Sequence, residues 1–135
     1  ASTDHLLELR KIFEPAYSLL AMEKATEADL ADIAAIVSDF EAKIKEGTQT
    51  AEDDLKFHER IMACTRNPFV MNVGLTIHQL FKASVNRSMR KIPDIALRDH
   101  RAIFDAFRKR DGRALQAAIL RSYEGWADSL GKSKE

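Results

Sequence analysis

The sequence has little of several features that small proteins use for stability or for special functions. It contains one cysteine, Cys64, so no disulfide can form within the chain, and this is typical of a reducing compartment. No run of apolar residues approaches the roughly 20 that a membrane span requires, and no signal peptide is visible. We therefore predict a cytoplasmic protein that does not associate with membranes.

The chain also lacks an excess of charge of either sign. It has 21 Lys and Arg residues against 21 Asp and Glu residues, so its formal net charge is zero. Because nucleic-acid binding depends on a surplus of basic side chains, we do not expect this chain to bind DNA by itself. Its 135 residues, of which 45% are apolar, suffice for a single globular domain with a sizeable core.

Glycine and proline are scarce, and most of them fall where the apolar periodicity is interrupted. Elsewhere apolar residues recur every three or four positions, which indicates amphipathic helices and no strands. Thr26 and Thr50 are each followed three residues later by an aspartate, as at capped helix starts. We expect helices at about 4–24, 26–47, 50–65, 68–90, 94–110 and 113–130. Their short connections predict an all-α antiparallel bundle of about six helices, with a central cavity for a ligand or metal.

Five polar residues fall on the otherwise apolar faces of these helices, namely Arg10, Asp54, His58, His100 and Ser122. Because an unpaired buried charge is costly, we expect these groups to meet in the core. Asp54 and His58 lie four residues apart on one helix face, so both can bind one ion. Carboxylate and imidazole suit zinc or another divalent first-row metal, and His100 would add a third ligand.

Each of these residues also has a purely structural interpretation that the spacing leaves open. His100 can be a hydrogen-bonded core histidine, and Arg10 can form a salt bridge with Glu14. The hydroxyl of Ser122 can bond back to its own helix, which is the more usual role of a helical serine. His78 is a possible substitute metal ligand, although we expect it at the surface or at an interface.

Three blocks of sequence carry a recognisable pattern. They are "ELRKIFEPAYSLLAMEKATEADLADI" (8–33), "DLKFHERIMACTRNPFV" (54–70) and "DHRAIFDAFRKRDGRALQAAI" (99–119). The first contains Glu-x-Arg, Glu-Pro, Ala-Thr and Asp-Leu, and the second contains Asp54, His58 and Asn67-Pro68. In this order, and over nearly the whole chain, they resemble the ligand-binding (FCD) domain of the FadR subgroup of GntR-type bacterial transcription regulators.

The resemblance implies an antiparallel helical bundle that senses a small organic acid and controls DNA binding by a winged helix. It also implies a homodimer, with the first and fourth helices supplying much of the contact surface. The winged helix is not recognisable here, since the sequence starts at the first bundle helix. We therefore expect residues 1–135 to form a single effector domain, with DNA binding located outside this chain.

The resemblance further implies that Asp54, His58 and His100 bind a divalent metal such as zinc, nickel or manganese. The family's usual fourth ligand is histidine, and this chain has Ser122 there, so we expect a weak three-ligand site or a metal-free pocket. Since histidine ligands must be neutral, metal retention should weaken below about pH 6. We assign Arg10, which can bind a carboxylate bidentately, together with Asn67 and Ser122, to effector binding.

We expect no enzymatic activity. The sequence presents no separate general acid or base, no nucleophile constellation and no glycine-rich phosphate loop. Two alternatives to a sensor domain stay open. One is a helical interaction module with a dry core, in which Asp54 and His58 form a structural pair. The other, less favoured, is a hydrolytic enzyme that activates water on a metal.

Overall fold

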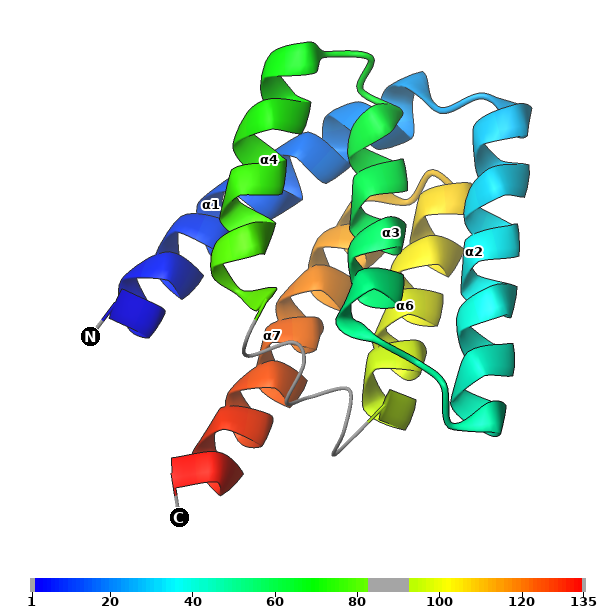
Figure 1. The fold of residues 1–135 in the computed structure, drawn as a ribbon. Coiled ribbons are helices and arrows are strands. Elements are labelled where there is room, and N and C mark those ends of the chain that lie inside the picture. Colours follow the sequence, from blue (N-terminus) through cyan, green and yellow to red (C-terminus); the bar gives the residue numbers. More distant parts are fainter. Residues whose placement is uncertain (1, 83–92, 135) are drawn as a thin grey trace.

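The computed structural model describes residues 2–82 and 93–134, with side chains of the last helix described as far as Glu124. These residues form helices and no strands, which confirms the all-α prediction (Figure 1). The helices are α1 (Ser2–Lys24), α2 (Glu27–Glu46), α3 (Ala51–Ala63), α4 (Pro68–Leu80), α6 (Pro93–Arg108) and α7 (Gly112–Lys134). No helix among them is both long and apolar enough to cross a membrane.

Local sequence signals set most of the helix ends. At the start of α2, the Asp29 amide donates to the Thr26 hydroxyl and the Thr26 amide donates to the Asp29 carboxylate, which completes the expected capping box. Gly47 ends α2 with a φ of 74°, a left-handed conformation that glycine adopts without strain. Both ends of α2 carry local signals within a few residues, and both lie within one residue of the predicted positions.

Helix α4 is shorter than predicted. The pattern indicated a helix as far as about Arg90, but α4 ends at Leu80 and Phe81 lies in a turn. The Phe81 side chain is only 2% exposed, and its ring lies 5.4 Å from the Arg10 guanidinium. The early end of α4 therefore coincides with the packing of Phe81 against α1. The rest of the predicted helix, residues 83–90, lies outside the described part of the chain.

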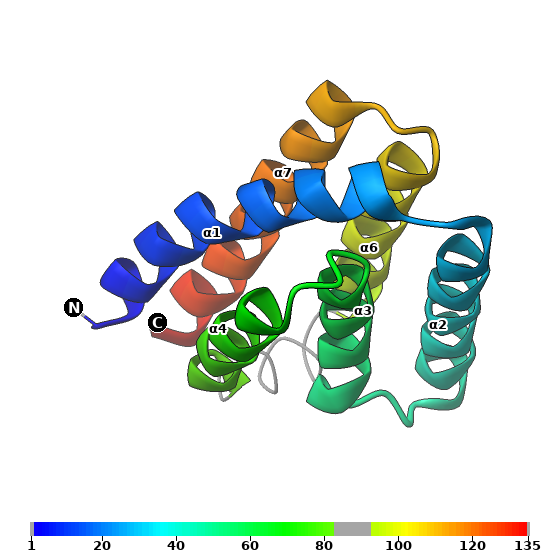
Figure 2. The same cartoon turned by 90° about the horizontal axis from the view of Figure 1, so that it is seen from above.

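The helices form an antiparallel bundle with α1 laid obliquely across it (Figures 1 and 2). Helix α2 packs on α3 and α6, and α6 packs on α7, while α1 contacts α3, α4 and α7. A Cβ atom at Gly74 would collide with Met62 of α3, so glycine there permits the close approach of α4 to α3. This approach brings the end of α4 next to the polar residues of α3.

The inward face of α1 differs from the one that apolar spacing alone would give. Leu9 and Ala16 continue the spacing of Leu6 and Phe13, but both are exposed, Leu9 by 46%. The buried side of the helix instead carries Arg10, Glu14 and Tyr17. Pairing between Arg10 and Glu14 lets two charged side chains occupy positions that hydrophobicity alone would give to leucine.

Candidate metal and effector site

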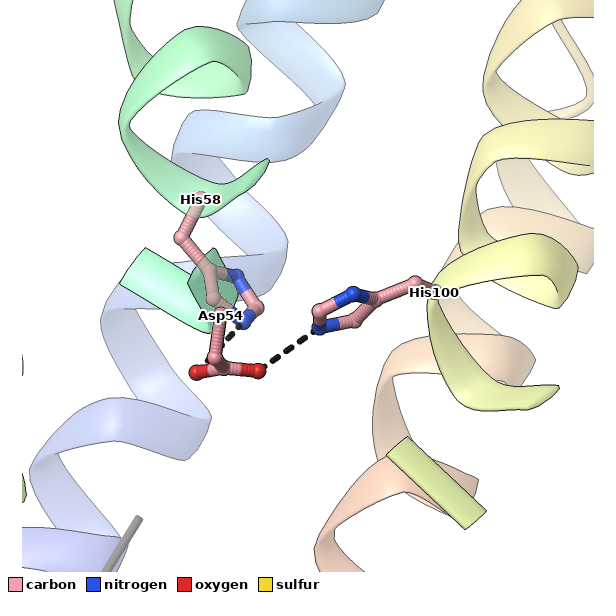
Figure 3. A group of neighbouring side chains, drawn as sticks. All are labelled: Asp54, His58 and His100. Carbon is pink, nitrogen blue, oxygen red and sulfur yellow. Dashed lines mark hydrogen bonds and ion pairs between the residues drawn. The ribbon is translucent and has the colours of Figure 1, made fainter. Parts of the chain in front are cut away.

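Two helices bring the predicted metal ligands together. Asp54 lies in the first turn of α3 and His58 one turn further on, while His100 comes from the middle of α6 (Figure 3). His100 Nε2 is 2.7 Å from Asp54 Oδ1, and His58 Nε2 is 3.7 Å from Asp54 Oδ2. Each residue offers one ligand atom such that all three lie within 4.8 Å of one another.

The donor set and its surroundings fit a divalent ion. Zinc binds imidazole nitrogen and carboxylate oxygen at about 2.0–2.2 Å, so ligand atoms up to roughly 4 Å apart can share one ion. A small inward movement of the three side chains would meet that limit. His58 Nδ1 also faces Glu14 Oε2 at 3.4 Å, the kind of carboxylate contact that orients metal-binding histidines. These side chains would hold the ion, which would offer open positions to a ligand.

Opposite charges hold the side chains of the cluster together. Burial disfavours the imidazolium of His58, but the carboxylates of Asp54 and Glu14 outweigh this effect and raise its pKa to about 9. Burial also opposes ionisation of Asp54, yet His58 and His100 hold the pKa of that carboxyl well below its usual range. At neutral pH a metal must therefore displace a proton from His58 before it can bind there.

Glu14 is the central residue of a second layer of buried polar groups around the cluster, which we did not predict. Its carboxylate, 2% exposed, accepts hydrogen bonds from Arg10 Nε at 2.7 Å and from the Tyr123 hydroxyl at 2.8 Å. Burial favours its neutral form, but Arg10 and His58 bring the pKa of Glu14 well below its usual value. Glu14 thus links α1 and α7 to His58 on α3.

Arg10 adopts the salt bridge that was the alternative to effector binding. Its guanidinium pairs with Glu14 and lies 5.4 and 5.6 Å from the ring centres of Phe81 and Tyr123. The pairing raises the pKa of Arg10 despite its burial, so this side chain stays charged. Contact between Arg10 and an effector carboxylate remains a prediction.

We expected His78 at the surface or at an interface, but its side chain is buried within the chain, so this expectation was wrong. His78 is 6% exposed, and its ring stacks on His58 with 4.8 Å between ring centres. Burial, together with the positive charges of Arg10 and His58, lowers the pKa of His78 well below its usual value. Beside it a small recess, partly open to solvent, is lined by residues that include Asp54 and His78.

Asn67 and Ser122 do not join the cluster. The Asn67 side-chain oxygen accepts from the amides of Phe69 and Val70, so it caps α4 beyond the far end of α3 from Asp54. The Ser122 hydroxyl donates to Ile119 O at 2.6 Å within α7, the structural role named as its alternative. Effector binding by either residue stays a prediction.

Two signals in the sequence pointed to the second layer. Glu14 follows Arg10 by four residues, the spacing of an ion pair on one helix face, and this pair could have been placed inward together. Tyr123 follows the buried Ile119 by four residues, so it was as good a candidate for the inner face of α7 as Ser122. An amphipathic tyrosine often carries a buried polar contact of this kind.

A carboxylate and two imidazoles that could hold a metal ion thus lie together inside this helical bundle. Comparison with known proteins gives the family, because the FCD domain matches residues 5–125. The chain therefore belongs to the FCD family, the effector-sensing domain of GntR-type transcription regulators. This confirms the resemblance read from the sequence. It also supports the expectation that the chain is not an enzyme, because the similar proteins with assigned roles are repressors.

The similar proteins differ from this chain in length. The galactonate operon transcriptional repressor of Escherichia coli is 32% identical over 84% of this chain and 51% of its own length. The transcriptional repressor NanR of Cronobacter sakazakii is 28% identical over 96% of this chain and 53% of its own. The chain thus spans about half the length of these curated relatives.

Two solved structures share the fold. Escherichia coli McbR/YncC has a TM-score of 0.86 at 14% identity, covering 98% of this chain and 66% of its own. Streptococcus agalactiae GntR has a TM-score of 0.76 at 24% identity, covering 91% of this chain and 56% of its own. At these identities the likeness supports the helical architecture alone.

Proposed function

We propose that this domain senses a small carboxylic acid through a divalent metal held by Asp54, His58 and His100. The observation that carries the proposal is the convergence of these three side chains from two helices on one buried point. A protein that needed only a stable core would be expected to fill this space with apolar residues, because buried charges gain little net stability. A Lewis-acidic ion at this point would bind the carboxylate of the effector.

Metal analysis tests the first part of the proposal. Protein purified without chelator or nickel resin should retain close to one equivalent of zinc, nickel or manganese. The Asp54→Ala and His58→Ala variants should lose it, while Glu59→Ala, on the same helix outside the cluster, should keep it. An apo protein whose melting temperature does not rise with any of the three ions would refute metal binding.

Effector binding is tested with the metal-loaded protein. The relatives suggest sugar acids, since one of them is named for a galactonate operon. A thermal-shift screen over sugar acids, hydroxy acids and dicarboxylates should find at least one that raises the melting temperature, because a ligand that binds only the folded state stabilises it. If no acid has any effect with or without metal, the sensor proposal fails.

We further propose that the domain forms a homodimer through α1 and α4. Exposed apolar side chains gather on these adjacent helices, including Ile12 at 70%, Phe69 at 78% and Leu80 at 59% exposure. A large exposed apolar patch is typical of an interaction site. Phe69→Lys should give a monomer in light scattering, whereas Leu120→Lys, at an exposed apolar position on α7, should leave the dimer intact. A monomeric wild-type chain would contradict this arrangement.

In the whole protein, we propose that effector binding resets two DNA-binding winged helices located outside these residues. The effector can do so only if it binds one arrangement of the dimer more tightly than another. The 135 residues alone should show no measurable affinity for DNA, which a mobility-shift assay can check. The neutral net charge supports this expectation.

One observation favours a second candidate, a helical interaction module without a small ligand. The His100–Asp54 hydrogen bond of 2.7 Å and the nearby His58 can act together as a structural charge cluster. In that case Asp54→Ala would destabilise the fold strongly, while metals and acids would change nothing. The metal and acid titrations above therefore distinguish the two candidates directly.

A further inference from the structure

The three candidate metal ligands differ in their contact with solvent. The side chain of Asp54 is 13% exposed, whereas those of His58 and His100 are only 6% and 4% exposed. The ring of His100 is also covered by Phe57, on which it stacks with 4.1 Å between ring centres. An ion that reaches this site from outside therefore meets Asp54 first.

Asp54 lines the small recess between the first turn of α3 and the end of α4. The recess is partly open to solvent and has room for about one water molecule. Because metal–ligand bonds of about 2.0–2.2 Å are shorter than hydrogen bonds of about 2.8 Å, space for one water also suffices for one divalent ion. The recess is thus large enough for a metal ion and too small for an organic effector.

A further imidazole, that of His78, lines the same recess. This side chain is 6% exposed, and its ring stacks on His58 with 4.8 Å between ring centres. Among the described residues, none forms a hydrogen bond or an ion pair with this imidazole. Buried polar groups normally have such a partner, so the unpaired nitrogens of His78 indicate a partner that enters through the recess.

The entrance of the recess carries charges of both signs. Glu52 and Lys82 belong to its lining, their charged groups are 2.7 Å apart, and both side chains are more than half exposed. The two carboxylates of Glu52 and Asp54 attract a divalent cation, whereas Lys82 repels it. Charges at a cleft act mainly on the association rate, and salt screens their effect.

We propose that the metal ion enters and leaves its site through this recess, with Asp54 and His78 as the first side chains that bind it. The ion then passes along the Asp54 carboxylate, which lines the recess and also bonds to His100. His78 is a transit ligand, because it is not one of the three residues whose ligand atoms lie within 4.8 Å of one another. The inference rests on the proposed metal site, and it concerns the rate of metal exchange.

Stopped-flow zinc exchange tests the route. Mixing metal-free protein with zinc and a fluorescent zinc indicator gives the association rate, and transfer of zinc from loaded protein to excess indicator gives the dissociation rate. Gln79→Trp, which places a large ring on the lining of the recess, should slow both rates by the same factor, roughly tenfold. The Kd should stay unchanged, because a blocked passage alters neither end state. His78→Phe, which keeps the stacked ring, should act in the same way, whereas Asn72→Trp, exposed on α4 outside the recess, should change neither rate.

Charge reversal at the entrance gives an independent check. Lys82→Glu should raise the association rate several-fold at low salt, because the entering dication no longer meets a positive charge. This gain should disappear at about 1 M salt, where charges are screened within about 3 Å. Lys56→Glu makes the same change of charge on α3 outside the recess, so its effect should be smaller.

The outcomes separate the route from the metal site itself. If the exchange rates of Gln79→Trp and His78→Phe equal those of wild type, or if His78→Phe weakens zinc binding without slowing association, the route is overturned and the metal site stands. Equal effects of Lys82→Glu and Lys56→Glu overturn the route as well. If wild type binds no divalent metal, both proposals fail. Melting temperatures show whether each variant is folded, and the two variants at the exposed residues Gln79 and Lys82 carry the test if His78→Phe is not.

Discussion

Glu14 is the buried charge whose replacement should destabilise this domain most clearly. Its carboxylate bonds to Arg10 and Tyr123 and faces His58, and the Arg10 residue is itself only 8% exposed. Glu14→Gln keeps the size of the side chain but leaves the Arg10 guanidinium buried without a counter-charge. Breaking a buried ion pair in this way costs roughly 3–5 kcal/mol, which lowers the melting temperature on the order of 10 °C.

A double replacement tests the reason for this loss. Arg10→Met combined with Glu14→Leu removes both charges, so no buried charge is left unpaired. It should therefore unfold at a higher urea concentration than Glu14→Gln, although it lacks the same ion pair. Urea unfolding of the metal-free protein, followed by circular dichroism, compares this double variant with Glu14→Gln. The single variants Arg10→Met and Glu14→Leu complete the cycle that gives the coupling between the two positions.

An exposed ion pair supplies the control. Asp105 pairs with Arg108 and Lys109 on the surface of α6, and Asp105→Asn should leave the unfolding midpoint unchanged within error. The reasoning is refuted if Glu14→Gln costs less than about 1 kcal/mol, the size expected of an exposed pair. It is equally refuted if the double variant loses the full sum of the single losses, because the two side chains would then act independently.

Further predictions concern the titration of His58 and the serine at position 122, where the family usually has a fourth metal-binding histidine. The pKa of His58 is about 9 in the folded protein and about 6.5 in the unfolded chain. Protonated His58 therefore stabilises the metal-free fold fully below about pH 6.5, and this stabilisation is lost as the pH rises through 9. Thermal melts from about pH 6 to pH 10 check this prediction. For the same reason zinc binding at pH 7.5 should release about one proton, measurable by calorimetry in buffers of different ionisation enthalpy. Metal affinity should therefore weaken already below about pH 9, and not only below pH 6 as the ordinary pKa of histidine suggested. Ser122→His should tighten zinc binding about tenfold if position 122 faces the ion, and unchanged affinity would show that it does not.

The sequence determined the helices and the three candidate metal ligands, Asp54, His58 and His100. Helix ends and helix faces depend on residues that are close together in the chain. Capping at Thr26, the left-handed Gly47 and the start of α4 at Pro68 are decided within a few residues. Asp54 and His58 share a helix face for the same reason, since four residues make about one turn. His100 was found because it shares a face with buried apolar residues of α6.

Only the tertiary structure decided which face of α1 is buried and what surrounds the three candidate metal ligands. Leu9 and Glu14 fit either side of that helix by spacing, and pairing with Arg10, His58 and Tyr123 placed the glutamate inside. His78 became a buried ring because Gly74 lets α4 approach α3 closely. A buried charge depends on partners from distant segments, and such partners are fixed only when the helices pack.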